Sequence, residues 1–166
     1  MSDTSHATAK PSTSKIISFI DLFDPVLDAA PDVIEARRKY NLIDVRGRLV
    51  RALEKRGKEY KGIERPKYFR RQWKQGECFY NAAEIVFKNP CATYVEGVAY
   101  HTVDLGFHHA WVTIDGVHAI DQTWPKPGIV YVGIDVPTDQ LLEALRHTDC
   151  YGHIIEKLEM LEGSAS

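Results

Sequence analysis

The stretch His108-His109-Ala110-Trp111-Val112-Thr113-Ile114-Asp115-Gly116-Val117-His118-Ala119-Ile120-Asp121-Gln122-Thr123-Trp124 decides the fold that we expect for this chain. Two runs rich in β-forming residues flank Asp115-Gly116, a strong signal for a short turn, so the stretch predicts a β-hairpin. One arm carries the imidazole of His109 and the other carries the carboxylate of Asp121. The chemical interest of the hairpin depends on whether these two side chains meet.

The length of the turn determines which side chains face each other. A two-residue loop would send His109 and Asp121 to opposite faces of the sheet. A three-residue loop, closed by Gly116 in the left-handed region, instead pairs Thr113 with Val117. His109 then lies directly opposite Asp121, with Cβ atoms roughly 4.5–5.5 Å apart, which suits a carboxylate that orients an imidazole. We adopt the second register, and with it a functional His109–Asp121 pair.

The length, composition and net charge of the chain are those of an ordinary globular protein. The chain has 166 residues, which suits one domain, and it is 44% hydrophobic and 27% charged. Its net charge of −2 gives no reason to expect nucleic-acid binding, and no apolar run has the roughly 18 residues that a membrane span needs. Three cysteines without CxxC spacing argue against disulfides or a zinc knuckle, so we expect reduced thiols in the cytoplasm, with no cofactor and no metal.

The order of the elements predicts the fold class. Residues 1–14 are expected to be a disordered leader, 15–161 a single domain and 162–166 a flexible tail. Within the domain, residues 15–23 are expected to form either a strand or a short segment laid over the core. Helices are expected at 31–41, 42–56, 76–87 and 138–147. Strands are expected at 93–100, in both hairpin arms and at 128–136, and residues 151–161 are expected to form a strand or a helix. Residues 57–75 look irregular. This order predicts an α+β fold in which N-terminal helices pack on an antiparallel β-sheet.

Cys78 is distinguished from the other two cysteines by its position. A helical pattern begins after Gly76, so Cys78 falls in the first turn of a helix. There the helix dipole stabilises a thiolate, which is the nucleophilic form of cysteine. Neither Cys91 nor Cys150 has this setting. The alternative is that Cys78 is a small buried apolar residue, as cysteine often is.

Cys78, His109 and Asp121 together follow the logic of an activated cysteine. His109 would take the thiol proton and later protonate a leaving group, while Asp121 would hold the imidazole tautomer. The backbone N–H of Cys78 is the natural first donor to an oxyanion. The amide of Gln72 or Gln75 would supply a second donor, and Gln72 is preferred because six residues leave room for the chain to turn back.

These motifs resemble a known superfamily. Gly76-Glu77-Cys78 at a helix start, His109-Ala110-Trp111 on a strand and Asp121-Gln122-Thr123-Trp124 on the next are similar to the core of the transglutaminase-like branch of the papain-like cysteine enzymes. The resemblance covers residues 72–124. It implies a papain-like core with Cys78 as nucleophile, His109 as base and Asp121 as orienting acid. It also implies thiol-acyl chemistry without fixing a substrate.

The sequence also departs from that pattern. A second histidine, His108, precedes the matched one, and strand alternation should point it away from Cys78. The calcium-site cluster of large transglutaminases is not recognisable. Tyr94-Val95-Glu96-Gly97 together with the 108–111 motif is similar to uncharacterised proteins of bacterial and phage genomes.

Three further residues are candidates for substrate binding. Glu96, on a strand beside the hairpin, is placed to bind a cationic group or tune His109, unless it faces solvent. Trp124 is placed to wall a substrate cleft. Trp73 belongs to the basic and aromatic run 67–74, a pattern that can grip nucleic acid but is weak evidence in an acidic protein.

The sequence therefore predicts a thiol hydrolase or acyltransferase that acts on an amide or related acyl bond through a thioester. Its partner would be a peptide, a protein or a small acyl substrate, with no nucleic acid and no membrane. One alternative is a non-catalytic binding domain that retains the papain-like fold. The other is a metal site built from Cys78, His109 and another histidine.

Overall fold

The computed structural model describes residues 42–69, 74–102, 105–148 and 150–164. The predicted leader, the segment at 15–23 and the helix at 31–41 lie outside these ranges. The described elements, in chain order, are α3 (Leu42–Arg56), β1 (Lys58–Ile63), a 3₁₀ turn η1 (Lys67–Phe69), α4 (Cys78–Lys88), β2 (Thr93–Thr102), β3 (Leu105–Thr113), β4 (His118–Ile120), β5 (Val130–Val136), α5 (Thr138–Thr148) and α6 (Ile154–Ser164).

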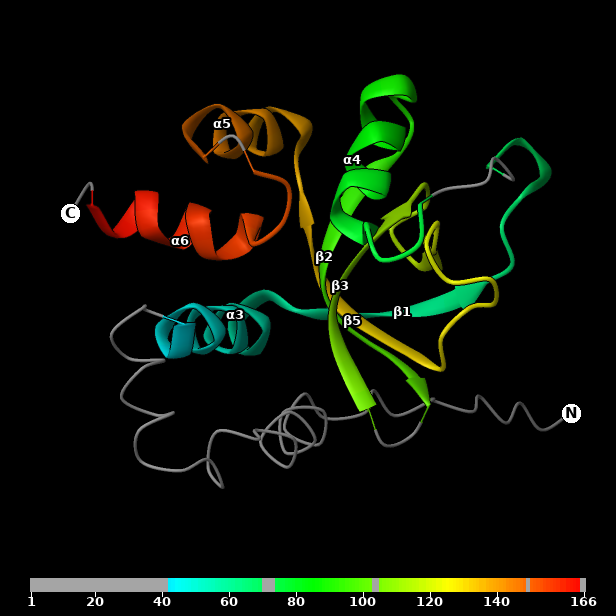
Figure 1. Cartoon of the computed structure of the whole chain (residues 1–166), viewed down its shortest axis with the longest axis horizontal. Helices are drawn as coiled ribbons and strands as arrows, with labels where there is room; N and C mark the ends of the chain where they lie inside the picture. Colours follow the sequence, from blue (N-terminus) through cyan, green and yellow to red (C-terminus); the bar gives the residue numbers. More distant parts are fainter. Residues whose placement is uncertain (1–41, 70–73, 103–104, 149, 165–166) are drawn as a thin grey trace, which may run out of the picture.

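The strands form a closed barrel in the order β1-β4-β3-β2-β5. β2 is central and pairs antiparallel with both β3 and β5. β1 closes the barrel because it pairs antiparallel with β5 through its first half and parallel with β4 through its second half. Figure 1 shows these strands crossing one another, with α4 packed against them and α3, α5 and α6 gathered to one side.

The predicted α+β fold class is therefore wrong. We expected N-terminal helices on an antiparallel sheet, whereas the described part of the chain is a mixed α/β fold in which five strands close into a barrel with one parallel strand pair. The error begins at residues 58–63, which were expected to be irregular. Only Tyr60 of β1 is buried, so this strand carries no alternating apolar pattern, and pairing with distant strands imposes its extended shape.

The hairpin forms with a register different from the predicted one. Val112 pairs with Ile120, two residues beyond its predicted partner. The cause lies in the turn, where the Asp115 carboxylate accepts the two backbone N–H groups that follow Gly116, at 2.9 and 2.8 Å. Residues 114–117 thus link the strands in place of a three-residue loop, although Gly116 does adopt the predicted left-handed backbone, with φ of +72°.

The register error leaves the faces of the hairpin unchanged. Because side chains alternate along a strand, a shift by two residues returns every side chain to its original face. His109 and Asp121 therefore still share a face, but they meet along a diagonal and not directly across the pair. The predicted contact survives for a reason other than the predicted one.

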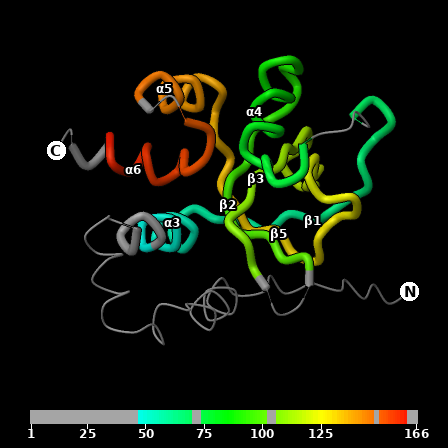
Figure 2. Tube along the Cα trace, viewed as in Figure 1, coloured from blue at the N-terminus to red at the C-terminus, as the bar shows by residue number. Residues whose placement is uncertain are grey.

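The barrel separates the buried residues into two layers. Each of the five strands sends at least one side chain into the interior, and this set is Tyr60, Val95, Ala99, Trp111, Ala119 and Tyr131. The alternate strand residues face outward and pack against the helices, together with Leu53, Ala82, Leu141 and Ile154. Figure 2 shows the resulting arrangement, in which α3, α5 and α6 lie beside the barrel and α4 lies across its strands.

The predicted helices at 42–56 and 138–147 are confirmed by α3 and α5, and the helix after Gly76 is confirmed by α4. The segment at 151–161, left open between strand and helix, contains α6, which continues to Ser164 into the predicted tail. Among the described residues, none of the helices has both the length and the apolar character required to cross a membrane.

Candidate active site

The Asp121 carboxylate is buried and held by four hydrogen bonds. Oδ2 accepts from His109 Nε2 at 2.8 Å and from the Tyr131 hydroxyl at 3.0 Å. Oδ1 accepts the backbone N–H groups of Thr123 and Trp124 at 2.7 and 3.1 Å. Burial raises the pKa of this carboxyl, but the hydrogen bond and charge of His109 and the two backbone donors outweigh burial and lower it. Asp121 is therefore a fixed negative charge.

His109 lies between this carboxylate and the thiol of Cys78. Its side chain shares the barrel-facing side of β3 with Trp111 and is 4% exposed. Burial lowers the pKa of the imidazole, but the hydrogen bond to Asp121, the charge of Asp121 and the nearby Cys78 thiol raise it to about 9. Since Nε2 is taken by Asp121, Nδ1 is the nitrogen left for the sulfur. The ring therefore has the orientation of a base with an orienting acid behind it.

Trp124 fixes the ring of His109 from one side. The two rings stack with centroids 4.3 Å apart and planes 14° apart. An indole face attracts a cation, so the stack favours the protonated form of the imidazole. Trp124, which was predicted to line a substrate cleft, therefore contacts His109, the predicted base, directly.

Cys78 is the first residue of α4, as the sequence predicts, and it is 7% exposed. Its backbone N–H belongs to the first turn, where no intrahelical acceptor exists. Asn81, one turn further along α4, is completely buried and donates from Nδ2 to the Lys74 carbonyl at 2.7 Å and to Thr123 Oγ1 at 3.1 Å. Asn81 therefore ties the segment before Cys78 to the segment after Asp121.

A pocket of about 440 Å³ opens beside Asp121. Its lining residues are Ile63, Glu64, Arg65, Asp121, Trp124, Pro125, Lys126 and Pro127. Trp124 contacts this pocket on one side and the His109 ring on the other. The pocket therefore lies on the Asp121 side of the three residues, and the two cations in its lining are matched by two carboxylates.

The structure places the other predicted residues as follows. Gln72 and Trp73 lie outside the described residues. Gln75 lies in the exposed turn before α4. Glu96 is completely buried on the face of the sheet opposite His109, where it contacts His108, so it neither faces solvent nor touches His109.

Two residues of the site were missed by sequence reasoning. Tyr131 reaches Asp121 from β5, and Asn81 links two loops from the interior of α4. Both look like ordinary members of their elements, and only the packing of the strands and of α4 brings them to Asp121 and to the segment that follows it. A weak local signal existed at Asp121, because an aspartate followed by two free backbone donors is typical of an Asx turn.

The comparisons with known proteins add no further constraint. No family model, no curated protein and no solved structure matches this chain.

Proposed function

We propose that this protein is a cysteine-dependent hydrolase or acyltransferase in which Cys78 is the nucleophile, His109 the general base and Asp121 the orienting acid. The observation that carries the proposal is the position of His109. Its buried imidazole is hydrogen-bonded to Asp121 at 2.8 Å, and Cys78, at the N-terminus of a helix, lies close enough to help raise the pKa of the ring. A nucleophile, a base and a group that orients the base are the three parts that thiol catalysis requires.

In the proposed reaction, the sulfur of Cys78 attacks an acyl carbonyl and forms a thioester. The leaving amine or alcohol takes the proton that His109 has received from the thiol. Water, or a second nucleophile, then gives its proton to His109 and attacks the thioester, which restores the thiol. The Cys78 backbone N–H, free at the helix start, is the nearest donor for the oxyanion that forms in both steps.

The substrate class follows from this chemistry, namely a peptide, a protein side-chain amide or a small acyl compound. The resemblance of the Cys78, His109 and Asp121 motifs to the transglutaminase-like enzymes supports the same class. The chemistry needs a reduced thiol, and the described cysteines Cys78, Cys91 and Cys150 are all free. A cytoplasmic location, where thiols are kept reduced, is part of the proposal.

The test is the pH dependence of alkylation of each cysteine by iodoacetamide, followed by peptide mass spectrometry. An ordinary thiol, with a pKa of about 8.5, loses about tenfold of its thiolate for each pH unit below that value. The exposed Cys91 and Cys150 provide that comparison within the same sample. We expect the ratio of Cys78 labelling to their labelling to rise steeply from pH 8.5 to pH 6, because His109 stays protonated beside the sulfur.

The His109→Ala variant should abolish this rise, so that Cys78 follows the other two thiols. His118→Ala is the matched control, because His118 also pairs with an aspartate, Asp115, at 2.6 Å but at an exposed turn. That variant should label as the unmodified protein does. A constant ratio across the pH range in the unmodified protein would refute the proposal, and reaction with an activated ester should leave the acyl group on Cys78 if the proposal is right.

A further inference from the structure

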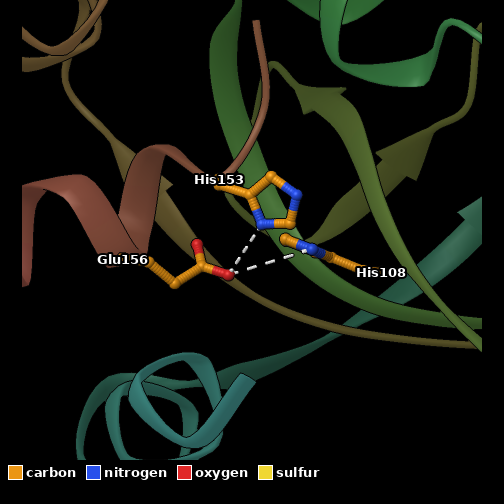
Figure 3. A group of neighbouring side chains, drawn as sticks. All are labelled: His108, His153 and Glu156. Carbon is orange, nitrogen blue, oxygen red and sulfur yellow. Dashed lines mark hydrogen bonds and ion pairs between the residues drawn. The ribbon is translucent and has the colours of Figure 1, made fainter. Parts of the chain in front are cut away.

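A second cluster of polar side chains lies on the other face of β3. His108 precedes His109, so its ring points to the opposite side of the strand. There it meets His153, which immediately precedes α6, and Glu156, in the first turn of α6 (Figure 3). One nitrogen of each histidine and one oxygen of Glu156 all lie within 4.8 Å of one another. The cluster uses none of the residues assigned above to catalysis.

We propose that His108, His153 and Glu156 bind one divalent transition-metal ion of the Zn²⁺ type. Two imidazole nitrogens and one carboxylate oxygen, with a position left for water, are a ligand set of zinc and of related first-row metals. Mg²⁺ and Ca²⁺ prefer oxygen ligands and are not expected to bind here. This inference does not depend on the function of Cys78.

The distances require a rearrangement of the side chains around such an ion. Glu156 Oε1 is 3.1 Å from His153 Nδ1 and 3.9 Å from His108 Nδ1. Metal–ligand bonds of 2.0–2.2 Å place the ligands of a tetrahedral site about 3.3–3.6 Å apart. The two measured edges therefore lie on either side of the required length, one a few tenths of an ångström shorter and the other a few tenths longer. Figure 3 shows the same Glu156 oxygen facing both rings.

The protonation of His108 supports the proposal. Its Nε2 lies 3.0 Å from Oε1 of Glu96, and a carboxylate only accepts, so Nε2 carries the proton. In the neutral ring the lone pair is then on Nδ1, the atom that faces Glu156. A buried carboxylate that orients a histidine from behind is the usual outer partner of a metal ligand. Glu96 is completely buried and also accepts from the Tyr94 hydroxyl at 2.7 Å, so it is firmly held.

Glu156 supplies an independent observation. Its side chain is 3% exposed, and its Oε2 atom has no hydrogen-bond partner among the described residues. A buried carboxylate oxygen without a donor is costly, and a cation at the cluster would offset the charges of Glu156 and Glu96. His153, in contrast, is half exposed, so an ion can enter from solvent. It also has a backbone φ of +55°, a left-handed conformation that is uncommon for a residue other than glycine.

The experiment is a titration of tag-free, chelator-treated protein with Zn²⁺ by calorimetry, paired with Co²⁺ absorption spectroscopy to report the coordination. We expect one equivalent of each metal per chain and no heat with Mg²⁺. His153→Ala and Glu156→Gln should remove most of the affinity. Glu96→Gln should weaken binding about 10–100-fold, as loss of an outer partner does.

The matched control is His147→Ala, because His147 is an exposed histidine paired with Glu143 at 2.8 Å on α5. It should bind Zn²⁺ as the unmodified protein does, and so should Cys78→Ala, which tests whether the metal sits at the other site. The proposal is overturned if no Zn²⁺ binds. It is equally overturned if His153→Ala and Glu156→Gln, folded by circular dichroism, bind normally, or if Cys78→Ala alone removes binding.

Discussion

Replacing Asp121 with alanine is expected to lower the free energy of unfolding by about 3–5 kcal/mol, the usual cost of breaking a buried ion pair from one side. The variant removes the acceptor of four hydrogen bonds at once. His109 would keep its buried ring with only Cys78 as a polar partner, and the Tyr131 hydroxyl would lose its acceptor. Uncompensated burial of these donors, more than the loss of attraction, accounts for the size of the effect.

The loss of stability in Asp121→Ala should depend on pH. The pKa of Asp121 is lowered in the folded protein, so its contribution is complete above the ordinary value of 3.8 and is lost as the pH falls through the lowered value. The pKa of His109 is raised to about 9, so its contribution is complete below 6.5 and is lost as the pH rises toward 9. The difference between the two proteins should therefore be greatest between these limits, and urea unfolding across pH 3–9 measures it.

Two variants separate charge from packing at this position. Asp121→Asn keeps the shape and an acceptor for the backbone donors, and it should recover part of the stability but little of the Cys78 reactivity. Asp115→Ala removes the carboxylate of the exposed Asp115–His118 pair, where water replaces the lost partners, so its effect should be much smaller. A loss for Asp121→Ala that does not vary with pH would contradict the ion pair as its cause.

Replacing Gly97 with alanine is expected to cost about 3 kcal/mol or more, the upper range for overpacking a core. An added Cβ would lie 2.0 Å from the Val132 carbonyl oxygen and 2.5 Å from the Gly133 Cα. Both are backbone atoms of β5, the strand that pairs with β2 here, so no side chain can rotate away. The strands must separate for alanine to fit.

The same substitution should also reduce the reactivity of Cys78. Gly97 pairs with His109 on its other side, so a displaced β2 moves the strand that carries the base. Thermal unfolding and the iodoacetamide ratio measure the two effects. Gly47→Ala is the control, since it lies within α3, its nearest atom is the flexible end of Arg51 at 3.3 Å, and alanine favours a helix by about 1 kcal/mol. An unchanged melting temperature for Gly97→Ala would show that β2 and β5 are not packed as described.

The local parts of this structure could be predicted from sequence. α3, α4 and α5 follow apolar periodicity, and the position of Cys78 at a helix start needs only the pattern after Gly76. The sharing of a face by His109 and Asp121 needs only strand alternation. These features depend on neighbours within a few residues, which is the range that a sequence pattern records.

The non-local parts could not be predicted. β1 forms because strands distant in sequence pair with it. Only Tyr60 of β1 is buried, so its sequence has no alternating apolar pattern that would predict a strand. Tyr131 joins the site through the pairing of the strands, and Asn81 joins it through the contact between α4 and the segment after Asp121. The His108 cluster depends on where α6 lies, because the spacing of His153 and Glu156 gives two ligands on one turn but says nothing of the third.

The barrel is not joined with equal strength around its circumference. β3 meets β2 along its full length, from the Thr93–Thr113 pair to the Thr102–Leu105 pair, but it meets β4 at the single pair of Val112 and Ile120. Local unfolding has the lowest free energy where the fewest backbone hydrogen bonds must break. We therefore expect local opening of the barrel at the seam between β3 and β4, which would expose the otherwise buried His109 while the sheet of β2, β3 and β5 stays intact.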